Sequence, residues 1–236
     1  MKKTTGWLLA GAVLAAASLA GAADVTGTIT LKGTPPKEKE ITPLKDDVNC
    51  GRLQPGMPTT HFYVVGSKGE LADVIVSLEG DGLSGKSTGA AAPLALLDQK
   101  GCEYSPQILA VQTEQKIVVK NSDPVLHNVH DQPTVPGNKE QNMAQPPGGA
   151  DLSFTMAKPE MFVKFKCEVH PWMFAWVSVF DHPYFAVSGK DGSFKIANVP
   201  PGKYTLKATH RKAGTVTQEI EVKEGLAPVS LTLEAK

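Results

Sequence analysis

The sequence predicts an all-β protein that contains two β-sandwiches, the second smaller than the first. Three observations support this prediction. The chain of 236 residues contains 22 glycines and 18 prolines, which divide it into many short segments. Many of these segments alternate apolar and polar residues with the period of a β-strand. No amphipathic helix of convincing length interrupts them, so the pattern favours β-sandwiches over helical bundles.

The alternation predicts where the individual strands lie. It indicates strands at residues 24–32, 61–65, 72–78, 108–120, 125–130, 152–156, 161–166, 175–180, 194–196, 204–206, 217–222 and 228–233. Val74-Ile75-Val76 is a continuous apolar run, which is typical of a strand buried on both faces. Residues 80–92 are mostly small, and residues 131–150 are rich in Pro, Gly, Asn and Gln. We expect surface loops at both places, and long ordered loops often carry function.

The N-terminus has the features of an export signal. Lys2 and Lys3 precede an apolar stretch, and Ala20-Gly21-Ala22 then fits a cleavage site. We therefore predict that residues 1–22 are a signal peptide; the alternative is a membrane anchor, for which the apolar run is short. Export would place the mature chain in the periplasm or otherwise outside the cell, with no membrane span after cleavage.

Charge and motif content narrow the classes of function. The chain has 24 Lys and Arg residues and 24 Asp and Glu residues. Removal of the two signal-peptide lysines leaves 22 against 24, a formal net charge of −2. No basic stretch indicates nucleic acid binding. No serine lies in a nucleophile elbow and no pair of carboxylates stands out, so we expect that the protein is not an enzyme.

The three cysteines have different surroundings. Cys50 and Cys102 lie in turn-like contexts, whereas Cys167 lies three residues before His170. An exported chain with three cysteines is expected to pair two of them and leave one over. We predict that Cys50 and Cys102 form a disulfide and that Cys167 remains a free thiol with a chemical role. The alternative is that Cys50 and Cys102 are free, or that one of them pairs with another chain.

Cys167, His170 and Met173 form the pattern C-x2-H-x2-M. A thiolate and an imidazole at this spacing can reach one metal ion from a single tight loop, and a thioether just beyond can approach from a third direction. Two His and one Cys with a distant Met is the donor set of type 1 copper sites. His127, which follows the segment Ile117-Val118-Val119-Lys120-Asn121, supplies the missing imidazole.

Residues from about 72 to 180 resemble a small blue copper protein, a cupredoxin of the plastocyanin–amicyanin kind. The resemblance rests on the His127-Asn128-Val129 segment and on Phe165-x-Cys167-x2-His170-Pro171-Trp172-Met173. It implies a Greek-key sandwich that holds one copper ion, cycling between Cu(I) and Cu(II). His127, Cys167 and His170 would be equatorial ligands and Met173 the axial one, while Asn128 would join the two ligand loops by hydrogen bonds.

The resemblance also implies a function. The chain would carry single electrons in the periplasm and dock with a redox partner protein, such as a c-type cytochrome or a periplasmic oxidoreductase. The alternatives are a copper carrier or sensor with exchangeable copper, and a surface interaction protein in which copper is structural.

Alternatives also remain within the site. Met173 could be an ordinary core residue, and Cys167 and His170 could be a structural pair without metal. His130 follows His127 on the same predicted strand, where we expect it to share the ligand face. Glu168, between two of the predicted ligands, is a further candidate donor.

The last part of the chain resembles the carboxypeptidase regulatory-like, or transthyretin-like, β-sandwich. The resemblance rests on Asp191-Gly192-x-Phe194-x-Ile196 and on Pro200-Pro201-Gly202-x-Tyr204-x-Leu206. We predict this sandwich at residues 182–236 and the copper domain at residues 61–181. Residues 23–60 form an N-terminal strand and an irregular segment. The strand is a candidate to complete the second sandwich, in which case the copper domain is inserted between its two pieces.

Overall fold

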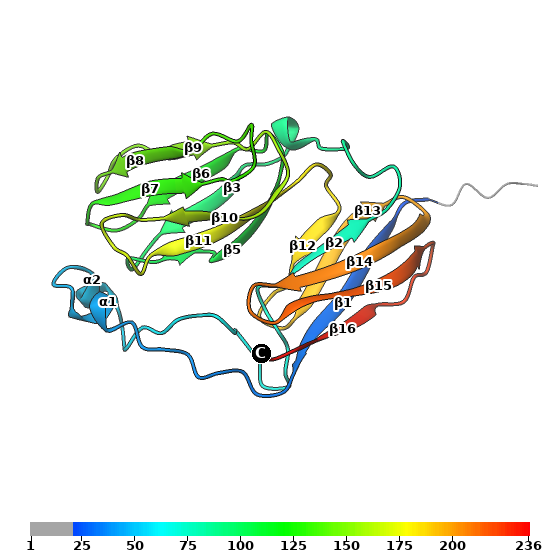
Figure 1. Cartoon of the computed structure of the whole chain (residues 1–236), viewed down its shortest axis with the longest axis horizontal. Helices are drawn as coiled ribbons and strands as arrows, with labels where there is room; N and C mark the ends of the chain where they lie inside the picture. Colours follow the sequence, from blue (N-terminus) through cyan, green and yellow to red (C-terminus); the bar gives the residue numbers. More distant parts are fainter. Residues whose placement is uncertain (1–20) are drawn as a thin grey trace, which may run out of the picture.

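A computed structural model describes residues 21–236, and it consists largely of β-strands in two sandwiches (Figure 1). The predicted all-β fold is confirmed. The predicted signal peptide lies almost entirely outside the described residues. Within the described part, no helix is long and apolar enough to span a membrane.

The first sandwich consists of strands β3 to β11. One sheet has the order β5-β11-β10-β7-β8 and the other the order β4-β3-β6-β9. The chain crosses repeatedly between the two sheets, as Greek-key connections do. The strands are β3 (Ala95–Gln99), β4 (Tyr104–Ser105), β5 (Ile108–Gln112), β6 (Ile117–Asn121), β7 (His127–Gln132), β8 (Gln141–Gln145), β9 (Leu152–Phe154), β10 (Glu160–Lys166) and β11 (Phe174–Phe180).

The second sandwich combines the two ends of the described chain. Its sheets have the orders β13-β1-β16 and β12-β2-β14-β15. In β1, Val25, Gly27, Ile29 and Leu31 face the core while the residues between them are more exposed, as the alternation requires. The strands are β1 (Ala23–Lys32), β2 (Ile75–Glu79), β12 (Phe185–Val187), β13 (Ser193–Val199), β14 (Gly202–His210), β15 (Gly214–Val222) and β16 (Val229–Glu234).

The first sandwich starts later than the predicted boundary at residue 61, since its first strand, β3, begins at Ala95. The apolar run at β2 does form a strand buried on both faces, but β2 pairs with β12 and β14 of the second sandwich. The second sandwich therefore extends beyond residues 182–236, and the first sandwich is inserted between β2 and β12. An apolar run shows that a strand is buried but carries no information about which sheet it joins.

Other local predictions were also wrong or incomplete. The single strand predicted at residues 108–120 is two strands, β5 and β6, which lie in different sheets. Residues 61–65 form no strand and contribute only an isolated bridge, Val65 to Leu71. The predicted loop at residues 131–150 contains β8, a polar edge strand that pairs with β7. β3 was not predicted, although it pairs with β6 at the centre of its sheet. A short 3-10 helix, η1 (Gly89–Ala91), lies in the connection between β2 and β3.

We call residues 33–60 the cap segment. It contains two short helices, α1 (Thr42–Asp46) and α2 (Cys50–Leu53), which lie at the end of the first sandwich (Figure 1). The predicted disulfide is present and joins Cys50 of α2 to Cys102, 52 residues later in the chain. A crosslink over that separation stabilises a fold by about 4 kcal/mol in the chain-entropy model.

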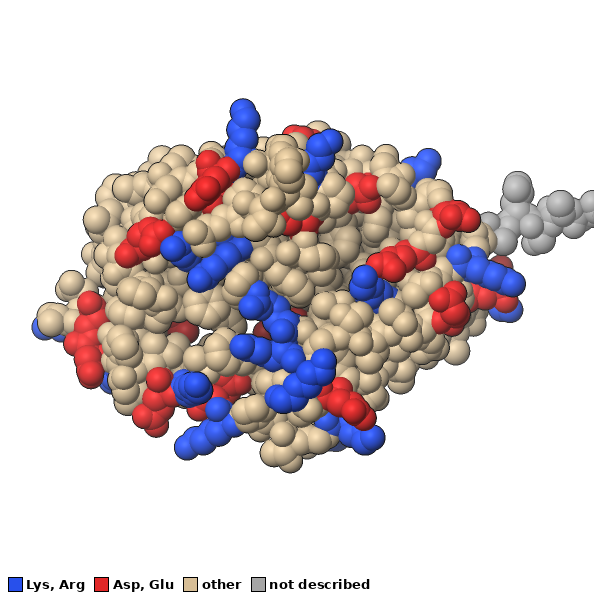
Figure 2. Space-filling model, viewed as in Figure 1, with Lys and Arg blue, Asp and Glu red and all other residues tan. Residues whose placement is uncertain are grey.

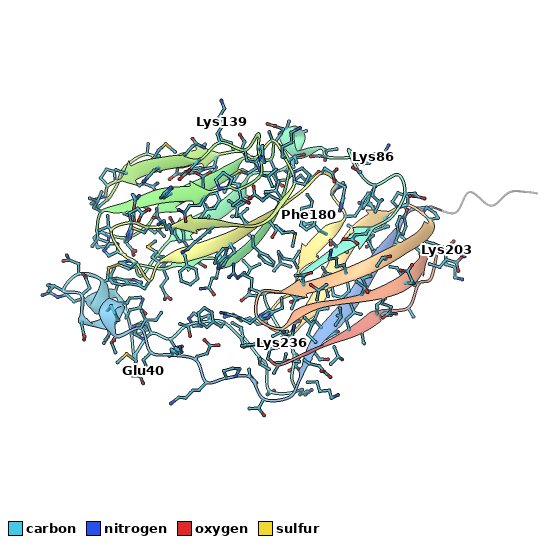
Figure 3. The ribbon with its side chains drawn as sticks, viewed as in Figure 1. Glu40, Lys86, Lys139, Phe180, Lys203 and Lys236 are labelled. Carbon is cyan, nitrogen blue, oxygen red and sulfur yellow. A yellow bond between two sulfur atoms is a disulfide. The ribbon has the colours of Figure 1, made fainter. Side chains whose placement is uncertain are left out.

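The junction of the two sandwiches is aromatic and basic. Phe180, labelled in Figure 3 where the first sandwich leads into the second, stacks on Phe185 with ring centroids 4.7 Å apart. The Arg211 guanidinium lies 3.2 Å from the centroid of the Trp176 ring. Figure 2 shows acidic and basic side chains interspersed on one face, with a group of basic side chains in the middle.

Candidate metal centre

Three of the four predicted ligands meet at one end of the first sandwich. His127 is the first residue of β7, and Cys167 and His170 lie in the turn between β10 and β11. The Nδ1 atoms of the two histidines are 3.0 Å apart. The Sγ atom of Cys167 lies 4.0 Å from Nδ1 of His127 and 3.6 Å from Nδ1 of His170. All three side chains are buried, so these donors are assembled in a space shielded from solvent.

The turn from Cys167 to Met173 is closed by its own backbone. The Cys167 N–H donates to the Met173 carbonyl at 3.0 Å, and the Met173 N–H donates to the His170 carbonyl at 2.9 Å. This tight turn is what brings a thiol and an imidazole three residues apart to one place. Met173 itself is buried and packs in the same core cluster as Cys167. Its role as the axial ligand stays a prediction.

Asn128 connects the two loops that carry the ligands. Its backbone N–H points to the Cys167 Sγ atom at 3.5 Å, and its side-chain Oδ1 accepts the N–H of Glu168. These are the contacts that the sequence resemblance implies for this residue. A hydrogen bond to the sulfur and a crosslink between the loops both limit movement of the Cys167 side chain.

Asp123 is a functional residue that the sequence reasoning missed. Its Oδ2 atom lies 3.0 Å from Nε2 of His127 and also accepts the Cys102 N–H at 2.7 Å, while Oδ1 accepts the Gly101 N–H at 2.6 Å. A carboxylate at Nε2 holds that nitrogen and so orients the ring, with Nδ1 turned toward Cys167. Asp123 belongs to an Asn-Ser-Asp-Pro turn, and that context indicated only a turn.

Burial and hydrogen bonding shift the pKa values of Cys167 and His127 in opposite directions. Burial alone would raise the pKa of the Cys167 thiol, but hydrogen bonds from His127 and from backbone N–H groups hold that pKa below its ordinary value. Burial would lower the pKa of His127, but its hydrogen bonds with Asp123 and Cys167 raise it overall. Burial and the neighbouring charge of His127 lower the pKa of His170. The surroundings therefore shift Cys167 toward the thiolate and His170 toward the neutral imidazole, the forms that bind metals, whereas His127 is shifted toward the imidazolium and must lose a proton to bind one.

His130 and Glu168, the alternative donors, lie outside the cluster. His130 is three residues after His127, an odd interval, so the alternation of a strand turns the two side chains to opposite faces. The expectation that they share a face was wrong. His130 instead places one ring nitrogen against Glu168 and the other against Glu140. Glu168 also pairs with Lys166, and its side chain is partly exposed.

The disulfide lies directly against the metal centre, which the sequence did not predict. The Sγ atoms of Cys50 and Cys102 lie within 4.8 Å of a ring nitrogen of His170. The indole N–H of Trp172 donates to the Cys102 carbonyl at 3.1 Å. His170 is only 7% exposed, because the cap segment covers this edge of the site through Cys50.

Two further histidines, His182 and His210, have structural contacts of their own. His210 is buried, and its Nδ1 accepts the backbone N–H groups of Lys212 and Ala213. His182 is buried and accepts the Tyr184 N–H. Neither belongs to the group of donors around Cys167.

No family model matches this chain, and no curated protein does. Among solved structures, the chain is similar to an oxidized point mutant of amicyanin, with 18% identity and a TM-score of 0.33 over 44% of this chain and 97% of that one. It is similar to a purple cupredoxin from Nitrosopumilus maritimus, with 23% identity and a TM-score of 0.30 over 36% of this chain and 98% of that one.

A Cu-containing nitrite reductase from Thermus scotoductus SA-01 also matches, with 17% identity and a TM-score of 0.33. That match covers 37% of this chain and 22% of the reductase, so the chain spans about a fifth of that protein's length.

Proposed function

We propose that this chain binds one copper ion through His127, Cys167, His170 and Met173 and carries single electrons in an extracytoplasmic space. The observation that carries the proposal is the buried cluster of two imidazoles and one thiol, whose donor atoms already face one another. Two imidazoles, one thiolate and a nearby thioether suit copper better than hard cations, which prefer oxygen donors. When bound there, copper supplies a one-electron couple between Cu(I) and Cu(II).

The surroundings of the donors support a carrier of electrons. Asp123 fixes His127, Asn128 joins the two ligand loops, and the backbone closes the turn from Cys167 to Met173. A site held in this way changes shape little when its charge changes by one. The same features disfavour a copper carrier with exchangeable metal, because the ligands are buried and the cap segment covers His170.

A redox partner protein would approach near the ligand loops. Leu126 and Val169 each directly precede a histidine ligand and are about half exposed, at 47% and 50%. Exposed apolar side chains beside buried ligands suit brief docking. A c-type cytochrome or a periplasmic oxidoreductase remains our expectation for the partner.

A visible absorption spectrum of the Cu(II)-loaded mature chain tests the proposal. We expect an intense thiolate-to-copper band in the wild type and its complete loss in Cys167→Ser. Met173→Leu should keep the band and shift the reduction potential, whereas the matched control Met161→Leu, at an exposed methionine, should change neither. Absence of the band from the wild type would contradict the proposed function.

A further inference from the structure

A second group of soft metal donors lies beside the first. Cys50, Cys102 and His170 place two sulfur atoms and a ring nitrogen within 4.8 Å of one another. All three residues are buried, and the two cysteines have no exposed surface. Because the sulfur atoms are joined as a disulfide, they offer no thiolate to a metal in this state.

Apart from the disulfide, α1 and α2 are held by a small apolar cluster. The helices contain five and four residues, and their fully buried core is Leu44 with the two half-cystines, against which Ile41, Leu53, Val125 and Trp172 pack. Gln54 adds a hydrogen bond from its side chain to the Gly101 carbonyl, next to the disulfide. Helices this short are not stable by themselves. Cleavage of the disulfide would therefore loosen α2 and allow the two sulfur atoms to separate enough to accept a metal ion between them.

We propose that Cys50, Cys102 and His170 form a second copper site, selective for Cu(I), that exists only when the disulfide is reduced. A dithiol reductant transfers two electrons and two protons to the disulfide, which becomes two thiols, while the reductant becomes a disulfide. Cu(I) then displaces the two thiol protons and binds both sulfur atoms. Thiolate sulfur is the donor that Cu(I) prefers, and a buried, dry position favours this soft ion over harder ones.

His170 belongs to both donor groups, so a copper ion at the second site would lie beside the first site. Cu(I) held by Cys50 and Cys102 lies next to the ligand that it must share with Cys167 and His127. Reduction of the disulfide thus uncovers the edge of the first site at His170 and creates a binding site for Cu(I) there. The redox state of the Cys50–Cys102 pair would decide whether copper can enter or leave.

The test uses the full mature chain with Cys167→Ser, which removes the thiolate of the first site. Cu(I) is titrated under anaerobic conditions in competition with a chromogenic Cu(I) chelator, before and after reduction with a dithiol that is then removed. We expect the reduced chain to take one equivalent of Cu(I) from the chelator and the oxidised chain to take none. Cys50→Ser in the same background should abolish the uptake.

His170→Ala in the reduced Cys167→Ser chain separates a folded site from two loose thiols. We expect its Cu(I) affinity to fall at least tenfold, whereas an unfolded chain would bind through the two sulfur atoms regardless of His170. Equal Cu(I) uptake by the oxidised and reduced chains would overturn the proposal, as would an affinity that does not depend on His170. The proposal does not rest on the electron-carrier function, whose test is the absorption band of the wild type with its disulfide intact.

Discussion

Asp123 and His210 are single buried residues that each accept several hydrogen bonds from their neighbours. Asp123 accepts hydrogen bonds from one ligand and from two backbone N–H groups of the turn that contains Cys102. His210 accepts two backbone N–H groups at the turn between β14 and β15. In both cases a polar side chain is buried because it satisfies donors that the backbone leaves free. Substitution of either residue therefore affects more than one contact.

We expect Asp123→Asn to weaken copper binding about 10- to 100-fold, the usual effect of losing a residue that orients a metal-binding histidine. The amide cannot accept hydrogen bonds on both of its heavy atoms, so either His127 or the Cys102 turn loses its partner. Chelator competition measures the change, and Asp151→Asn, at an exposed position, is the control. Unchanged affinity would show that Asp123 does not position His127.

The stability of the second sandwich should depend on pH through His210. Burial lowers the pKa of His210 to about 4. The folded state therefore disfavours its protonated form, while the unfolded chain takes up a proton near its ordinary pKa of about 6.5. The stabilisation is present above that pH and is lost as the pH falls toward 4. Thermal melts of the wild type and His210→Asn should converge over this range, and an offset that stays constant from pH 7 to pH 4 would contradict this role of His210.

β1 shows how an element at one end of the sequence becomes the centre of a sheet. It pairs antiparallel with β13 on one side and parallel with β16 on the other. Gly27 is paired with Phe194 of β13 and with Val229 of β16. An added Cβ atom there would be 2.0 Å from the Val229 carbonyl oxygen and 2.6 Å from the Phe194 ring. Glycine is required at this position for space.

We expect Gly27→Ala to destabilise the protein by about 2–3 kcal/mol, since the backbone of β16 must move to admit the methyl group. Denaturant unfolding of the second sandwich measures the loss. Gly56→Ala in the cap segment is the matched control, because no atom lies within 4 Å of the added carbon. If both variants are equally stable, the packing of β1 is looser than these distances indicate.

The whole molecule is organised by the insertion of one sandwich into the other. β1 and β2 precede the first sandwich in sequence, but each lies inside a sheet of the second. The two sandwiches are thus joined by two chain crossings and by the stacking of Phe180 on Phe185. Removal of the N-terminal strands would expose both sheets of the second sandwich.

A fragment of residues 182–236 should therefore not fold. It lacks β1, which joins β13 to β16, and β2, which joins β12 to β14. We expect a disordered far-UV circular dichroism spectrum and no cooperative melt. Addition of a second chain fragment carrying residues 23–79 should restore β-structure if these pairings are the missing ones. A cooperative melt of residues 182–236 alone would contradict this topology.

The sequence by itself determined the features that depend on neighbours along the chain. Alternation predicted most of the strands, the spacing of Cys167 and His170 together with His127 predicted the three donors that meet, and the contexts of the cysteines predicted the disulfide. Only the tertiary structure decided which sheet β2 joins, that Asp123 contacts His127, and that the Cys50–Cys102 pair lies against His170. These features arise from contacts between residues far apart in sequence, and local periodicity is equally compatible with several such pairings.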